Sequence, residues 1–303
     1  MRIYQIAHAG FDIGEYSKKI TDMIFKKIRS ISINIKGSDY YTPFESEFKL
    51  LNRPIDYSVF VDNEDLQGIQ ECFNTVPFLS KRDEKSKEKD KYDKMLYDRK
   101  SQRLKIVLQF RDKYDQLESG DIFFPGFFRS NPSKLEIDII ILPNVINDNL
   151  HLALTNTVEH ELQHYAQYIS NVPWRGDGFS ASKDGYGKYV NHLEELQAFI
   201  SGISAQLSEL AIGYISFDDM RKMESEEEAL AYINNKTSYF PSLIVTHAKS
   251  LRISPKNFKD FVKSILRMIN QKIKFSVHKL FIASRENNIN DLEDDWEDDH
   301  ENT

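Results

Sequence analysis

The first part of the chain switches between a helical hydrophobic period and simple alternation. Apolar residues recur at helical spacing over residues 17–29, which predicts an amphipathic helix. Residues 31–36 alternate between apolar and polar, which predicts a half-buried strand, and two further strands are expected at 57–61 and 122–124. Residues 104–110 fit a strand or a helix equally well.

The pattern becomes stronger from residue 135 onward. The run LEIDIIIL, residues 135–142, is the clearest strand signal in the chain, and Pro143 ends it. Helical periodicity then dominates in four segments, residues 150–170, 189–212, 225–234 and 256–287. A glycine-rich stretch at 171–187 separates the first two helices and would suit a mobile lid. The order of elements predicts an α+β fold whose C-terminal half is mainly helical.

Composition limits the classes of function and of metal site that this chain can have. The net charge of -7 argues against a protein that binds nucleic acid by neutralising phosphates. With one cysteine, Cys72, the chain cannot form an internal disulfide, and any metal must be held by histidine and carboxylate side chains. No secretory signal or long apolar run is evident, so we expect a cytoplasmic protein without a membrane partner.

Two charged segments flank the expected core. Residues 81–103 mix many positive and negative charges, which predicts a solvated insert within an N-terminal α+β part, residues 1–134. We expect residues 135–288 to form the core together with the C-terminal helices. The acidic stretch at 289–303 is expected to be a disordered tail.

The candidate chemistry lies in TNTVEHELQHYAQY, residues 155–168, which contains H-E-x-x-H. His160 and His164 are four residues apart and therefore share one face of the predicted helix, where both rings could reach one ion. Glu161 is rotated by about 100° and would lie beside that ion, in the position of a general base. The helix also carries an apolar stripe that can hold it in a core: Leu154, Val158, Leu162, Tyr165 and Ile169.

A catalytic zinc needs a third protein ligand and an open position for water. The helix predicted at 189–212 supplies three candidates, His192, Glu194 and Glu195. Its buried stripe is expected to be Leu193, Leu196, Ile200, Ile203, Leu207 and Leu210. The two glutamates lie on opposite flanks of that stripe, so periodicity alone does not separate them.

These motifs resemble the zincin metallopeptidases, over roughly residues 135–205. Gln167 and Ser170 stand where the metzincin branch has glycine and its third histidine, which excludes that branch. The sequence ELQA from Glu195 resembles the E-x-x-A of the gluzincin branch, which favours Glu195 as third ligand. A site completed by His192 would instead resemble the DNA–protein crosslink proteases. The resemblance implies a zincin-like fold, with a small mixed sheet whose edge strand lies beside the H-E-x-x-H helix.

The resemblance also implies a mechanism. Zn²⁺ would be bound by His160, His164 and Glu195, and Glu161 would activate water against the bond of a peptide or protein substrate. Tyr189 is the first candidate for an electrophilic partner of the oxyanion, with Tyr186 and His192 as alternatives. Asn156, Thr157 and Asn191 are candidates for fixing the imidazole rings.

The strand at 135–142 is expected to be the edge strand beside this helix. Alternation then directs Glu136 and Asp138 toward the cleft or solvent, which would give a substrate groove an acidic rim. Two other functions remain open: a zincin-like protein that binds metal without turnover, and a metal-dependent hydrolase of a non-peptide amide.

Overall fold

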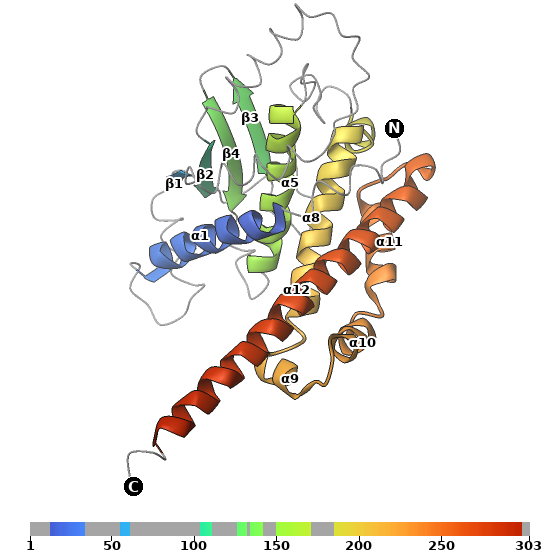
Figure 1. The fold of residues 1–303 in the computed structure, drawn as a ribbon. Helices are drawn as coiled ribbons and strands as arrows, with labels where there is room; N and C mark the ends of the chain where they lie inside the picture. Colours follow the sequence, from blue (N-terminus) through green and yellow to red (C-terminus); the bar gives the residue numbers. More distant parts are fainter. Residues whose placement is uncertain are drawn as a thin grey trace, which may run out of the picture.

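A computed structural model describes residues 13–33, 55–60, 104–110, 126–131, 134–141, 150–170 and 185–298. Within these residues, a small sheet is followed by layers of helices (Figure 1). The elements are α1 (Ile13–Ile33), β1 (Ile55–Phe60), β2 (Leu104–Phe110), β3 (Gly126–Asn131), β4 (Lys134–Ile141), α5 (Leu150–Ser170), α7 (Tyr186–Val190), α8 (Leu193–Ile212), α9 (Phe217–Lys222), α10 (Glu226–Lys236), α11 (Phe240–Ser250) and α12 (Pro255–Asp298).

The sheet has four strands in the order β1-β2-β4-β3. β2 and β4 run parallel, whereas β1 pairs with β2 and β3 pairs with β4 in antiparallel fashion. The expectation of an α+β fold with a small mixed sheet is therefore confirmed. The sheet joins strands from both sides of the boundary expected at residue 134.

The prediction that residues 135–142 form the edge strand is wrong. β4 lies between β2 and β3, and the outer strand on the side of α5 is β3, which the sequence pattern did not predict. Alternation along LEIDIIIL defines two faces of a strand, but it carries no information about which strands pair with it. The tightly connected hairpin of β3 and β4 decides that question.

Glu136 and Asp138 do not form an acidic rim. The two residues are only 4% and 3% exposed, and each carboxylate is paired with a basic side chain on a neighbouring strand. Lys105 Nζ on β2 lies 3.3 Å from Glu136 Oε1, and Arg129 Nε on β3 lies 2.7 Å from Asp138 Oδ2. The two acids of the central strand are thus neutralised within the sheet by cross-strand pairs.

α5 packs against the face of the sheet that is opposite to Glu136 and Asp138. Phe128 on β3 contacts the rings of Tyr165 and Tyr168 on α5, with centroids 6.1 and 5.7 Å apart. The apolar stripe expected along residues 150–170 is confirmed, because all five of its members are buried. α1 crosses α5 near the N-terminal end of α5 (Figure 1).

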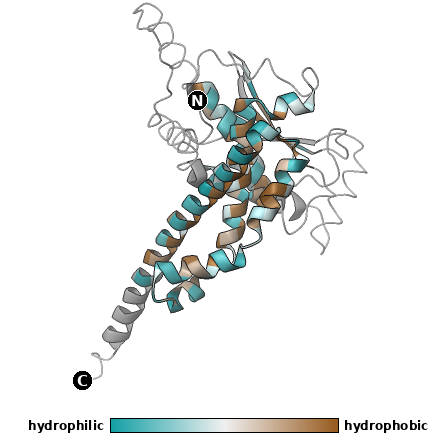
Figure 2. Ribbon diagram, turned by 90° about the vertical axis from the view of Figure 1, so that its right-hand side faces the viewer, coloured by the Kyte–Doolittle hydropathy of each residue, from teal (hydrophilic) through white to brown (hydrophobic). Residues whose placement is uncertain are grey.

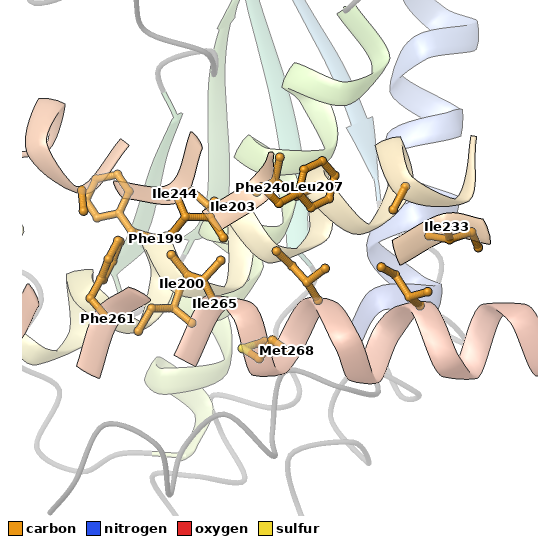
Figure 3. Packing of buried hydrophobic residues seen from close by; sticks show 14 of the residues in the cluster. Phe199, Ile200, Ile203, Leu207, Ile233, Phe240, Ile244, Phe261, Ile265 and Met268 are labelled. Atoms are coloured by element: carbon orange, nitrogen blue, oxygen red, sulfur yellow. The ribbon is translucent and has the colours of Figure 1, made fainter. Parts of the chain in front are cut away.

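α8 separates α5 from the C-terminal helices. Its apolar residues point toward α10, α11 and α12 and form one hydrophobic cluster with them (Figure 3). At its centre Phe199, Ile200 and Ile203 of α8 pack with Phe261 and Ile265 of α12. The predicted stripe is right at its four central positions, whereas Leu193 is exposed and Leu210 is only partly buried.

Several boundaries differ from expectation. Residues 31–33 belong to α1 and not to a strand, because the apolar period of this helix continues through them. α12 continues to Asp298, past the expected end at 287 and into the expected tail (Figure 1). The coloured part of this long helix carries both hydrophilic and hydrophobic residues (Figure 2). α9 and α11 were not predicted; Ser216 caps α9 in a capping box with Asp219.

Other predictions concern segments outside the described residues. These are residues 34–36 of the strand expected at 31–36, the strand at 122–124, the charged segment at 81–103, residues 171–184 of the expected lid and residues 299–303 of the expected tail. Residues 104–110 form a strand, which resolves the ambiguity between strand and helix. In the part of the chain that the structure describes, no helix is both long enough and apolar enough to cross a membrane.

Candidate metal centre

Two histidines of α5 face α8 and lie against each other. His160 Nε2 and His164 Nε2 are 3.2 Å apart, and both residues are at most 9% exposed. α5 runs without interruption from Leu150 to Ser170, so the four-residue spacing places the two rings on one face, as predicted. The ring of Phe199 lies against the His160 ring, with centroids 4.6 Å apart.

Glu195, in the first turn of α8, completes a group of three possible ligands. Its Oε1 lies 3.4 Å from His164 Nε2, and its Oε2 lies 3.6 Å from His160 Nε2. These three buried side chains are the group of histidine and acidic residues that could hold a metal ion among the described residues. The structure therefore brings together the three residues that the sequence analysis favoured.

The two competing candidates lie apart from this group. His192 stands at the N-cap position of α8 without a capping hydrogen bond from its side chain, and its Nδ1 is 3.9 Å from Glu194 Oε2. Glu194 contributes its main-chain carbonyl to the surroundings of the site, where it accepts a hydrogen bond from Gln167. The α8 N-terminus thus turns Glu195, and not its neighbour, toward α5.

A glycine allows α8 to approach α5 closely. A Cβ at Gly202 would lie 2.5 Å from Asn156 Oδ1, 2.6 Å from the Asn156 carbonyl oxygen and 3.3 Å from His160 Cβ. Only glycine fits this contact without a shift of the helices. Because Gly202 lies two turns beyond Glu195 on the same helix, the close contact also sets the distance between Glu195 and the histidines.

Glu161 lies beside the three residues and faces β3. Its Oε1 is 4.0 Å from His160 Nε2, and a Cβ at Gly126 would lie 2.6 Å from that same oxygen. Burial raises the pKa of Glu161 above its usual value; the two histidines oppose that shift, as does a hydrogen bond from the Phe128 main chain. Glu161 is thus a buried carboxylate held between α5 and the outer strand.

Two of the three clustered side chains, His164 and Glu195, shift each other's pKa. Burial alone would lower the pKa of His164, but the Glu195 carboxylate outweighs it and raises that pKa to about 9. Burial would raise the pKa of Glu195, yet the charge of His164 and hydrogen bonding with both histidines hold it well below its usual range. Without an ion, His164 and Glu195 thus stabilise each other's charged forms.

Tyr189 reaches the site from the short helix α7. Burial and the nearby charges of Glu195 and Glu161 raise the pKa of its hydroxyl, which hydrogen-bonds to Glu195. Tyr186, by contrast, is 38% exposed. Of the three electrophile candidates, Tyr189 is therefore the one that the structure places against the carboxylates.

The segment that carries Tyr189 is anchored to the turn between α11 and α12. The expected helix 189–212 is broken after Val190, and Asn191 bridges the break. The Asn191 amide donates to the carbonyls of Gly187 and Arg252, at 2.7 and 3.1 Å, and its Oδ1 accepts from the Ser254 N–H at 2.7 Å. Asn191 therefore positions the backbone of α7, which differs from its expected role beside an imidazole.

The remaining contacts between α5 and α8 form a series of polar pairs. Moving along α5, Thr155 bonds to Glu209, Asn156 to Gln206, Glu159 to Ser201 and Gln167 to Gln197. Partner numbers fall on α8 as they rise on α5, so the helices are antiparallel and the pairs fix their relative position. The sequence analysis missed Gln167, which it weighed only as a departure from the metzincin pattern.

The geometry and the donor set fit Zn²⁺. Tetrahedral coordination with bonds of about 2.0–2.1 Å places ligand atoms about 3.3 Å apart, close to the 3.2, 3.4 and 3.6 Å observed here. Two imidazoles and one carboxylate are a donor set typical of catalytic zinc. Among the described residues, Oε2 of Glu161 is buried without a hydrogen-bond partner and could accept one from a water at the ion.

Comparison with known protein families, with curated proteins and with solved structures found no match to this chain. The zincin resemblance thus stays an expectation from the motifs. The case for a metal centre comes from the chain's own residues and their arrangement.

Proposed function

We propose that this protein is a zinc-dependent peptidase, with His160, His164 and Glu195 as ligands and Glu161 as general base. The observation that carries the proposal is the buried convergence of His160, His164 and Glu195, with a second buried carboxylate, Glu161, beside them. A purely structural role would not need Glu161 there, because a carboxylate buried with a single main-chain hydrogen bond is costly to fold.

The chain's own groups are suited to hydrolysis. Zn²⁺, when bound, would lower the pKa of a coordinated water and polarise the substrate carbonyl. Because burial raises its pKa, the Glu161 carboxylate is a better proton acceptor than an exposed glutamate. Glu161 would accept a proton from the attacking water and return it to the leaving amine.

Tyr189 would supply the second electrophilic contact. Burial and the neighbouring carboxylates raise its pKa, so that the hydroxyl keeps its proton at neutral pH. The single hydrogen of this hydroxyl, which it gives to Glu195 here, would turn to the oxygen on which negative charge develops. The Asn191 contacts hold its helix, so that the donor is placed before substrate binds.

The outer strand supports a peptide as the substrate. β3 lies at the edge of the described sheet, and its main chain at Gly126 and Phe128 runs past Glu161. An extended peptide can bind by adding a strand to a sheet edge, which would carry its carbonyl groups past the general base. The proposed substrate strand is therefore β3 and not residues 135–142, and Glu136 and Asp138, which are paired within the sheet, take no part in it.

Zinc titration of the purified chain tests the metal centre. We expect about one Zn²⁺ per chain, and loss of that binding in His160→Ala, His164→Ala and Glu195→Gln. Glu194→Gln is the matched control, since its carboxylate lies outside the group, and it should keep the wild-type affinity. Full zinc retention in both histidine variants would reject the site.

Turnover is tested separately with Glu161→Gln. The zinc-loaded variant should bind the ion as wild type does but lose cleavage of a peptide library monitored by mass spectrometry. If wild type binds zinc and cleaves no peptide, it is a metal-binding protein or acts on another amide. If Glu161→Gln cleaves at the wild-type rate, Glu161 is not the general base.

A further inference from the structure

Gln167 is buried between the two helices that carry the candidate ligands. It lies one turn after His164 on α5 and is 1% exposed. Its carboxamide makes three hydrogen bonds, with His164 Nδ1 at 2.9 Å, the Glu194 carbonyl oxygen at 3.0 Å and Gln197 Oε1 at 2.9 Å. Both hydrogens of its amide nitrogen and one side of its oxygen are therefore used.

These partners determine which way the amide points. A main-chain carbonyl can only accept a hydrogen bond, so the Gln167 nitrogen must face Glu194. The Gln167 oxygen must then face His164, and His164 Nδ1 must carry the hydrogen of that bond. In the neutral ring this leaves the lone pair on Nε2, the atom that faces His160 and Glu195.

The same amide also holds the ligand helix α8. Glu194 immediately precedes Glu195, and Gln197 follows two residues later, so both donor bonds end in the first turn of α8. A change in the Gln167 side chain would thus disturb His164 on one helix and Glu195 on the other.

We propose that Gln167 is the positioning residue of the metal centre, selecting the ring tautomer of His164 and fixing the turn that presents Glu195. The inference rests on the proposed zinc site but adds a residue that does not touch the ion. Gln206 provides a matched comparison. It makes a similar side-chain hydrogen bond across the same helix pair, from Asn156 at 2.8 Å, but its partner is not a ligand.

Zinc affinity separates a positioning role from a merely structural one. In Gln167→Met, which keeps the volume and removes all three hydrogen bonds, we expect zinc to bind about 10- to 100-fold more weakly. Gln206→Met should lower thermal stability but leave the dissociation constant for zinc unchanged. Wild-type affinity in folded Gln167→Met would overturn the proposal.

A second measurement uses the wild-type chain and does not depend on a variant's folding. Ring ¹⁵N–¹H spectra of the zinc-loaded protein should show His164 with its hydrogen on Nδ1, assigned by the signal absent in His164→Gln. Coordination through Nδ1, with the hydrogen on Nε2, would overturn the proposal. If wild type binds no zinc at all, the proposed function fails, and this outcome is distinct from unaltered zinc binding in Gln167→Met.

Discussion

Gly126 of β3 lies so close to Glu161 of α5 that a methyl group at its Cα would come within 2.6 Å of the carboxylate oxygen. The same methyl group would be 2.8 Å from Glu161 Cγ and from Thr157 Cγ2. The position of Glu161, the proposed general base, is therefore set by the absence of a side chain on the neighbouring strand. The strand that would bind substrate and the base that would act on it are in direct contact.

Gly126→Ala should impair turnover without removing the metal. The added methyl group displaces Glu161, and a misplacement of about 1 Å in a catalytic group can cost about 100-fold in rate. The three ligands lie on α5 and α8 and are not touched, so zinc affinity should stay at the wild-type value. Parallel measurements of zinc binding and peptide cleavage test this separation.

Gly187→Ala is the control for that variant, because a Cβ at Gly187 would meet nothing within 4 Å. It should keep both zinc binding and turnover. Unchanged cleavage by Gly126→Ala would contradict the assignment of Glu161 as the base in this geometry.

Gly202→Ala, in contrast to Gly126→Ala, should weaken zinc binding itself. Its Cβ would lie 2.5 and 2.6 Å from two oxygens of Asn156, so α8 must move away from α5 and take Glu195 with it. We expect weaker zinc binding and a loss of about 1–3 kcal/mol in the free energy of unfolding, as is usual for overpacking. Calorimetric zinc titration and denaturant unfolding measure the two effects.

Gly213→Ala tests whether a methyl group added elsewhere, at the end of α8, would weaken zinc binding as well. Gly213 follows α8 in helical conformation, and its Cβ would meet carbonyl oxygens at 3.4 and 3.5 Å. This variant should bind zinc normally. Equal zinc affinity in Gly202→Ala and Gly213→Ala would show that the close helix contact does not set the ligand geometry.

The sequence predicts the helix of the two candidate histidine ligands better than its surroundings, for a physical reason. The ligand spacing and the apolar stripe of residues 150–170 are local, so the pattern places His160 and His164 on one face directly. Which glutamate completes the site depends on how α8 rotates against α5, and that rotation is set by close contact at Gly202. Periodicity along one helix holds no such information.

The strand beside the site was assigned wrongly for a related reason. The outer strand GFFRSN is short and poor in β-branched residues, so its β propensity is weak; its hairpin partner, residues 134–141, dominates the pattern. The break between α7 and α8 was not predicted because no local sequence signal marks it. Asn191 holds it through hydrogen bonds to residues 61 and 63 positions away in the chain.

Lys272→Met should destabilise the protein strongly. Lys272 of α12 reaches the fully buried Glu159 next to His160, at 3.1 Å, and Ser201 donates to the same oxygen at 3.0 Å. Removing the lysine leaves a buried carboxylate without a counter-charge, which costs about 3–5 kcal/mol. Denaturant unfolding of the metal-free chain measures the loss.

Glu159→Gln combined with Lys272→Met should recover much of that stability, since both charges are then absent. If the double variant is no more stable than Lys272→Met alone, the effect comes from lost packing of the lysine stem and not from the ion pair.

The pH dependence of stability should report the cluster around His151. This ring lies between Glu209 of α8 and Asp22 of α1, bonded to Glu209 through Nδ1 and to Asp22 through Nε2 at 2.8 Å. The hydrogen bond to Glu209 raises its pKa above 6.5 most strongly; burial opposes the shift, and Asp22 adds to it. His151 therefore joins three helices best when it is protonated.

The sign of the pH effect follows from that shift. A group whose pKa is higher in the folded state contributes its full stability below the unfolded value of about 6.5 and loses it as pH rises through the folded value. The stability that wild type gains over His151→Gln should thus be largest near pH 6 and shrink as the solution becomes alkaline.

His247 provides the opposite case, because burial lowers its pKa. Wild type should lose stability relative to His247→Gln as pH falls below about 6.5. Unfolding curves for the three proteins across this range decide the matter: a pH-independent difference for His151→Gln would show that its charge does not join the helices.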